Sequence, residues 1–329
     1  MDHFQQLQQA AQNGDIPEHL AAVIHNFYLS YEEAVKENGY TVSQIQPLLN
    51  QFLQLVIKQL KSPDAFELFH HHIKSPFNYY TFGLDFIRPL VIFSKSTVLG
   101  ENNIQAIEAS LAQGDNVILL ANHQTEPDPQ AISLLLEKHH PKLAEEMIFV
   151  AGHRVISDPL ATPFSKGRNL LCIYSKRHIE NEPETKAEKL SHNQRTMKKM
   201  VQLLDEGGKC IYVAPSGGRD RPCPKGEVGV AKFDPQSIEM FWLMTQQAGK
   251  KTHFYPLALA TYDLLPPPHS IDKALGERRH AHSTPIHLSF GSPIDMSHYP
   301  GSDDPDKKKR REHRAEYIWN LVAADYLKF

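Results

Sequence analysis

Cysteine is scarce in this chain of 329 residues. Its three cysteines, Cys172, Cys210 and Cys223, are odd in number and show no C-x-x-C spacing. This pattern argues against a disulfide framework and against a zinc ribbon. The cysteine content therefore fits a protein of a reducing compartment.

Long apolar runs and a charge of one sign are also missing. No apolar run approaches the roughly 18 residues of a membrane-spanning helix. The first 15 residues lack the basic and apolar regions of a secretory signal and the Arg- and Ser-rich character of a transit peptide. A net charge of −3 gives no global preference for nucleic acid or anionic lipid. We expect no nucleic-acid partner and at most peripheral membrane contact.

The N-terminal part of the chain is predicted to be helical. In the third predicted helix, apolar residues recur at three- and four-residue steps, which is typical of one buried helix face. Four helices are predicted, at residues 1–13, 17–38, 41–61 and 62–73. We interpret residues 1–76 as a small helical-bundle domain. The histidines at 70–72 would point about 100° apart on such a helix, so they are not expected to bind one metal ion.

Helix and strand signals alternate in residues 77–329. Strands are predicted at 116–121, 147–151, 170–174, 209–214, 253–260 and 285–290, and helices at 104–113, 129–139, 191–206, 235–248 and 305–326. Such alternation is typical of an α/β fold with a mostly parallel sheet flanked by helices. We interpret LPPPHS at 265–270 as a rigid surface turn, and the charge run at 303–314 as the polar start of the last helix.

One candidate catalytic pair follows the first long apolar strand. In NVILLANHQTEPDPQ, at residues 116–130, His123 comes just after the strand and Asp128 five positions later. Ligands of open α/β sheets bind at the carboxyl ends of the strands. A neutral imidazole can take a proton from a hydroxyl, and a carboxylate can hold the ring in the required tautomer. The alternative is that Asp128 is an N-cap, with Pro129 opening the next helix.

Two further strand ends carry basic groups. LLCIYSKRH ends in Lys176, Arg177 and His178, and KCIYVAPSGGRDRP places Arg219 and Arg221 after adjacent glycines. Glycines let a ligand approach the backbone, and guanidinium groups match phosphate oxygens. If the strands are parallel, these groups lie at the same sheet edge as His123. The alternatives are a solvated loop and pairing of the intervening aspartate with an arginine.

Several segments together resemble the soluble glycerol-3-phosphate 1-O-acyltransferases of plastids and of some bacteria. These segments are NHQTEPDP, the stretch from VAGHRVISDPL to FSKGRNLLCIYSKRH, APSGGRDRP, and FYPLALATYDLLPPP. The resemblance covers essentially the whole chain and implies a bacterial cytoplasm or a plastid stroma as the compartment. Membrane-bound lysophosphatidate acyltransferases usually show an EGTR-type block where this chain has SGGRDRP. That difference favours glycerol 3-phosphate as the acceptor.

The resemblance implies transfer of a fatty acyl group from an acyl carrier protein (ACP) or coenzyme A (CoA) thioester to the sn-1 hydroxyl of glycerol 3-phosphate. It matches His123 and Asp128 to the catalytic His-x4-Asp pair. It also places a phosphate-binding cluster on the basic residues, which are Lys176, Arg177, His178, Arg219 and Arg221. Arg177 departs from the lysine of relatives but keeps the charge.

We expect direct attack without an acyl-enzyme, because Cys172 and Cys210 lie within predicted apolar strands. No cofactor or metal and a monomer are expected. Two other functions are considered: a metal-dependent phosphoester hydrolase with His123, Asp128 and His178 as ligands, and a non-catalytic module that binds a phosphorylated metabolite.

Overall fold

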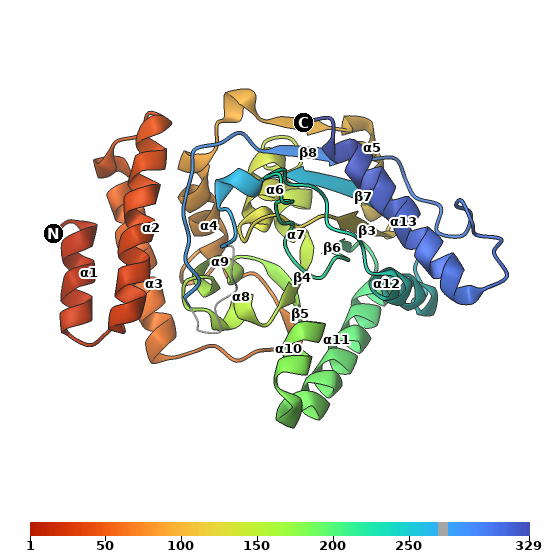
Figure 1. The fold of residues 1–329 in the computed structure, drawn as a ribbon, viewed down its shortest axis with the longest axis horizontal. Helices are drawn as coiled ribbons and strands as arrows, with labels where there is room; N and C mark the ends of the chain where they lie inside the picture. The colour runs from red at the N-terminus through yellow and green to blue at the C-terminus, as the bar shows by residue number, and fades with distance from the viewer. Residues whose placement is uncertain (269–275) are drawn as a thin grey trace.

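The computed structural model describes residues 1–268 and 276–329, without the side chain of Arg177, and confirms the predicted α/β class. Figure 1 shows helices on both sides of one sheet. The strands are β1 (Phe69–His70), β2 (Thr97–Leu99), β3 (Asn116–Ala121), β4 (Ile148–Gly152), β5 (Asn169–Ile173), β6 (Cys210–Val213), β7 (Thr252–Ala260) and β8 (His287–Phe290). The longer helices are α1 (His3–Gln12), α2 (Glu18–Glu37), α3 (Val42–Lys61), α4 (Tyr79–Ile87), α5 (Glu101–Ala112), α6 (Asp128–Leu136), α11 (Lys186–Glu206), α12 (Pro235–Gln247) and α13 (Lys307–Tyr326). The shorter ones are α7 (Pro141–Glu146), α8 (Arg154–Ser157), α9 (Thr162–Ser165) and α10 (Lys176–Asn181), with 3-10 turns at Arg88–Leu90, Phe93–Lys95, Pro183–Thr185 and Tyr262–Leu264.

The sheet has the strand order β1-β5-β4-β6-β3-β7-β8-β2. Its five central strands, β5, β4, β6, β3 and β7, run parallel. Strand β1 pairs antiparallel with β5 and β8 pairs antiparallel with β7, whereas β2 and β8 run parallel to each other. Parallel strands end at the same side of a sheet, so the loops after β3, β5, β6 and β7 share one edge. The predicted convergence of these loops rests on this topology.

Every residue of β3 is buried, because helices cover both faces of the sheet. Its odd-numbered residues, Val117 and Leu119, pack in a cluster with apolar side chains of α5, α6 and α7. Its even-numbered residues, Ile118 and Leu120, pack in a second cluster with α11, α12 and α13. This period of two explains why the strand reads as a continuous apolar run in the sequence.

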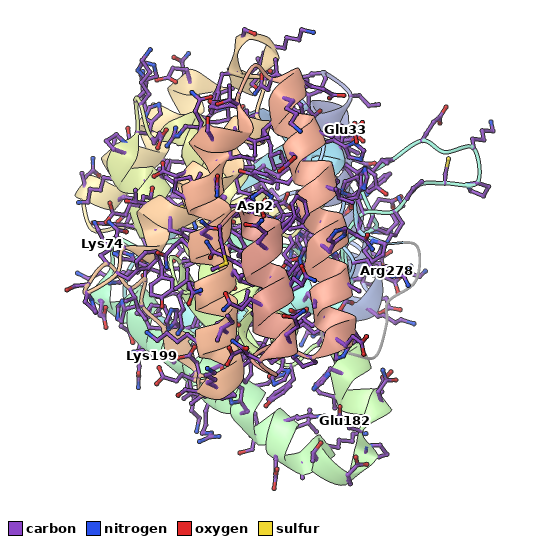
Figure 2. All side chains as sticks on the ribbon, turned by 90° about the vertical axis from the view of Figure 1, so that its left-hand side faces the viewer. Asp2, Glu33, Lys74, Glu182, Lys199 and Arg278 are labelled. Carbon is purple, nitrogen blue, oxygen red and sulfur yellow. The ribbon has the colours of Figure 1, made fainter. Side chains whose placement is uncertain are left out.

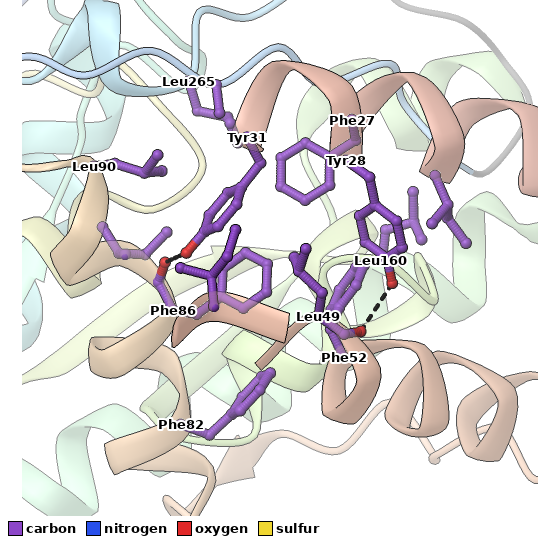
Figure 3. Close-up of a cluster of buried hydrophobic side chains, with 14 of the residues drawn as sticks. Phe27, Tyr28, Tyr31, Leu49, Phe52, Phe82, Phe86, Leu90, Leu160 and Leu265 are labelled. Carbon is purple, nitrogen blue, oxygen red and sulfur yellow. Dashed lines mark hydrogen bonds between the residues drawn. The ribbon is translucent and has the colours of Figure 1, made fainter. Parts of the chain in front are cut away.

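Helices α1, α2 and α3 lie side by side on one flank of the molecule (Figure 2). Their apolar side chains form one cluster with α4 and with Ala131 and Leu134 of α6. Figure 3 shows the aromatic part of this cluster, in which the Tyr31 hydroxyl donates to the Phe86 carbonyl at 2.6 Å. The core between the N-terminal helices and the rest of the chain is therefore continuous. The division into domains at residue 76 stays a prediction.

The predicted helix at residues 62–73 is wrong. The segment instead runs along the sheet edge, where Phe69 pairs with Leu171 in β1 and β5. The Ile73 N–H donates to the Lys166 carbonyl at 2.8 Å. These hydrogen bonds join residues about 100 positions apart, so the local apolar pattern does not reveal them. Pro63, the second residue of the segment, also disfavours a helical conformation in Ser62 before it.

The other predicted elements are present, with ends that differ by at most five residues; the largest difference is the start of α11, at Lys186 instead of 191. The sequence did not predict α4, β2 or the short helices α7 to α10. In the predicted turn at 265–270, residues 269 and 270 lie outside the described residues.

Candidate functional site

Buried Asn122 fixes the loop that follows β3. Its amide nitrogen donates to an Asp220 carboxylate oxygen at 2.9 Å and to the Leu259 carbonyl at 3.0 Å, and its amide oxygen accepts from the Leu259 N–H at 2.8 Å. The Tyr212 hydroxyl donates to the Asn122 carbonyl at 2.6 Å. The Asp220 N–H donates to the His123 carbonyl at 2.6 Å. The backbone of His123 is thereby tied to β7 and to the loop after β6.

The predicted pair of His123 and Asp128 is in contact. The distance from His123 Nδ1 to Asp128 Oδ2 is 2.7 Å, and the His123 side chain is 31% exposed, whereas that of Asp128 is 1% exposed. An ionised carboxylate only accepts hydrogen bonds, so the imidazole takes the tautomer in which Nδ1 donates. Nε2 then carries the lone pair and is the ring nitrogen left to accept a proton from a ligand.

Four donors surround the carboxylate of Asp128. In addition to His123, Oδ2 accepts from the Gln124 N–H at 2.8 Å. Oδ1 accepts from the Thr125 N–H at 3.2 Å and from the Thr261 hydroxyl at 2.6 Å. These donors hold the carboxylate in one orientation. Asp128 is therefore built to hold the ring of His123.

The alternative interpretation of Asp128 as an N-cap is wrong. Helix α6 begins at Asp128 itself, its cap position is Pro127, and no side chain caps it. The Asp128 side chain folds back over the preceding loop, so both of its oxygens bond to groups outside the helix.

The arginines after β6 lie beside the loop of His123. The Arg219 guanidinium donates to a Glu277 carboxylate oxygen at 2.5 Å, and Arg221 donates to the Pro268 carbonyl at 2.6 Å. Burial, followed by the charge of Arg219, lowers the pKa of Arg221. A second positive charge close to Arg221 is what an anion site requires. The backbone N–H of the residue between these arginines bonds to the His123 carbonyl, so the predicted convergence with His123 is present.

Asp220, the residue between these arginines, has another role. It is fully buried, and its carboxylate accepts from the Asn122 side chain and from the Ala231 N–H, both at 2.9 Å. Burial raises the pKa of this carboxyl group. Asp220 thus fixes the loop, and the predicted alternative in which it neutralises an arginine is not what the described contacts show.

The basic residues after β5 are held differently. Lys176 begins α10, is 66% exposed, and donates to the carboxylate of Asp234 at 2.7 Å. The Asp234 N–H bonds to the Pro215 carbonyl in the loop after β6, which links the two strand ends. The backbone of Arg177 belongs to α10, and its side chain lies outside the described part of the structure.

His178 packs among aromatic rings. Its ring centroid lies 5.0 Å from that of His153 and 5.4 Å from that of Tyr174. Burial, followed by the charge of Lys189, lowers the pKa of His178. Burial and the charge of Lys189 thus disfavour the positive charge of His178, which can still offer a hydrogen bond to a ligand.

Comparison with known proteins identifies the family. The family model for acyltransferases matches residues 95–260. The chloroplastic glycerol-3-phosphate acyltransferase of Cucurbita moschata is 39% identical over 97% of this chain and 72% of its own length. The chain belongs to the glycerol-3-phosphate acyltransferase family. The enzyme of Spinacia oleracea is 42% identical over 83% of this chain and 59% of its own length. The enzyme of Phaseolus vulgaris is 37% identical over 99% of this chain and 71% of its own length.

Membership in this acyltransferase family does not favour a phosphoester hydrolase or a non-catalytic module. Among residues 1–268 and 276–329, no group of three or more histidine, cysteine or acidic side chains could hold a metal ion. No helix within these ranges is long and apolar enough to cross a membrane.

Two of the three cysteines of this acyltransferase are poor nucleophiles, as predicted. Cys172 and Cys210 are buried in β5 and β6. Burial raises the pKa of each thiol to about 12. The thiols therefore stay protonated at neutral pH, which is unfavourable for nucleophilic attack.

A buried ion-pair network that the sequence did not predict lies beside the candidate site. Arg279 donates to both carboxylate oxygens of Glu126 at 2.9 Å and lies 3.6 Å from Asp158. Burial disfavours the charge of Arg279, but Glu126 and Asp158 outweigh this effect and raise its pKa. Glu126 lies within the motif NHQTEPDP, yet its partner is 153 positions away, so spacing alone gave no signal.

Proposed function

We propose that this chain transfers a fatty acyl group from a thioester to the sn-1 hydroxyl of glycerol 3-phosphate, giving lysophosphatidate. The observation that carries this proposal is the His123–Asp128 pair, with Nε2 free of Asp128 and two arginines at the same sheet edge. The names of the relatives support the choice of acceptor.

The proposed chemistry is direct attack. Nε2 of His123 takes the proton of the hydroxyl as its oxygen bonds to the thioester carbonyl carbon. Asp128 stabilises the imidazolium that forms, because its carboxylate accepts the Nδ1–H bond. The carbon–sulfur bond then breaks, and the leaving thiolate takes the proton from Nε2. No cofactor and no acyl-enzyme take part in this scheme.

The proposed phosphate site consists of Arg219 and Arg221, with Lys176, Arg177 and His178 at its β5 side. Charge-assisted hydrogen bonds to guanidinium groups contribute about 1.5 to 3 kcal/mol each. Such bonds fix the acceptor, so its hydroxyl is presented to His123 in attack geometry.

We further propose that the enzyme works in the plastid stroma, because the relatives are chloroplastic by name. We also propose that it works as a monomer. Either an acyl carrier protein or a coenzyme A thioester would serve as the donor. Rates with the two donors in competition would identify the preferred one.

The test is acylation of glycerol 3-phosphate by wild type and by His123→Ala. Loss of a general base should lower the rate by roughly 10² to 10⁴-fold. A matched control is His253→Ala, since His253 also pairs with a carboxylate, Asp115 at 2.8 Å, but at the start of β7. Equal rates for wild type and His123→Ala would refute the role of His123. No product with either donor from wild type would refute the proposed function.

A further inference from the structure

The carboxylate of Glu277 pairs with Arg219, one of the two arginines proposed to bind phosphate. Its carboxylate lies 2.5 Å from Arg219, and the two side chains are only 10% and 16% exposed. A guanidinium that is this buried is costly to leave without a counter-charge. In the absence of substrate, Glu277 supplies that charge.

The backbone around Glu277 holds its carboxylate in place. The N–H of Gly276 donates to Asp158 at 3.1 Å, and the carbonyl of Glu277 accepts from Arg279 at 2.6 Å. Arg279 is itself bound by Glu126 of the His123 loop. Arg278, which lies between Glu277 and Arg279 in the sequence, is exposed (Figure 2). Glu277 is thus directed inward by the same network that borders the catalytic loop.

We infer that Glu277 is an internal competitor that stands in for the substrate phosphate at Arg219 and so sets the affinity for glycerol 3-phosphate. This inference rests on the proposed function. A phosphate monoester carries more charge than one carboxylate and has three acceptor oxygens, so it can bind Arg219 and Arg221 together. The phosphate therefore displaces the carboxylate, but the contact that is lost weakens net binding. Glu277 is a specificity residue that acts through Arg219, not a catalytic residue.

The decisive variant is Glu277→Gln, which keeps the size of the side chain and removes its charge. A charge-assisted hydrogen bond is roughly twice as strong as a neutral one. We expect the KM for glycerol 3-phosphate to fall by about three- to tenfold, with a smaller change in kcat. An unchanged or higher KM would overturn the inference, because a carboxylate that merely supports Arg219 would weaken binding when removed.

A second measurement separates this inference from the proposed function. Inorganic phosphate should raise the melting temperature Tm of Glu277→Gln more than that of wild type, because at equal concentration a ligand stabilises the folded state more when it binds more tightly. This readout needs no thioester or turnover, so it stands even if no acylation is found. An equal or smaller phosphate effect on Glu277→Gln would overturn the inference.

Two further variants complete the design. Glu277→Asp keeps the charge but withdraws the carboxylate from Arg219 by one methylene group. Its phosphate affinity should lie between those of wild type and Glu277→Gln. If Glu277→Gln fails to fold, a phosphate affinity of Glu277→Asp at or below that of wild type would overturn the inference. Glu239→Gln is the control, because Glu239 is 15% exposed and pairs with Arg311 and Arg314 of α13. A fall in KM for this variant as large as that for Glu277→Gln would also refute the inference.

A double variant tests the route of the effect. If Glu277 acts through Arg219, the Glu277→Gln change should lose its benefit in an Arg219→Gln background. An undiminished gain in phosphate affinity there would show that Glu277 acts elsewhere.

Discussion

The loop after β3 and the basic groups after β5 and β6 lie at one sheet edge, but their side chains are held by different kinds of contact. In the loop, both oxygens of Asp128 accept hydrogen bonds from fixed donors, and the carboxylate sets the tautomer of His123. In the basic groups, the partner of Arg219 is Glu277, and that of Lys176 is Asp234. The contacts of the loop suit a fixed catalytic geometry. Those of the basic groups must be exchanged when a phosphate binds.

This difference teaches which substitutions should affect turnover and which should affect affinity. A loop that is fixed before substrate arrives needs no reorganisation during the reaction. A cation that is already paired with a carboxylate loses that contact when it binds phosphate, so the net free energy of phosphate binding is smaller. We therefore expect changes in the loop to lower kcat, and changes in the basic groups to move KM.

The largest effect in this comparison is expected for Asp128→Asn. An asparagine cannot stabilise the imidazolium as a carboxylate does, so kcat/KM should fall by about 10² to 10⁴-fold. The matched control is Asp115→Asn, which alters the other Asp–His pair, with His253, away from this edge. Steady-state kinetics on folded protein measures both. A loss of less than tenfold would mean that Asp128 positions the loop without assisting the base.

An intermediate effect is expected for Arg221→Gln. Loss of one charge-assisted bond, about 1.5 to 3 kcal/mol, should raise the KM for glycerol 3-phosphate by roughly 10- to 100-fold and change kcat less. Arg278→Gln is the control, because Arg278 is a nearby exposed arginine. A fall in kcat with an unchanged KM would move Arg221 from the binding group to the catalytic group.

The smallest effect is expected for Lys176→Gln. Lys176 is 66% exposed and already paired with Asp234, so solvent and salt screen its charge. We expect the KM to change by less than about threefold, with the difference disappearing at high salt. A tenfold rise in KM would show that Lys176 leaves Asp234 and contacts the phosphate directly.

The central strands and His123 could be predicted because their signals are local. Strand β3 has the predicted bounds, since burial on both faces requires a continuous apolar run. The loops after β5 and β6 followed from the parallel order. The segment at residues 62–73 could not be predicted, because its hydrogen-bond partners lie in β5 and in the loop that precedes β5.

The same limit applies to the site. The contact between Glu277 and Arg219 spans 58 positions, and that between Arg279 and Glu126 spans 153. No periodicity or motif records such pairs. The N-cap interpretation of Asp128 failed for a related reason, since Thr261 lies 133 positions away and is one of the donors that hold the carboxylate.

Helix α6 belongs to two packed clusters at once. Its first residue is Asp128, its residues Ile132 and Leu136 pack with the sheet, and Ala131 and Leu134 pack with α2, α3 and α4. Melting of the N-terminal helices would therefore uncover the back of the helix that begins at Asp128. Proteolysis or thermal unfolding of α1 to α3 should therefore also inactivate the enzyme. The two parts should unfold cooperatively.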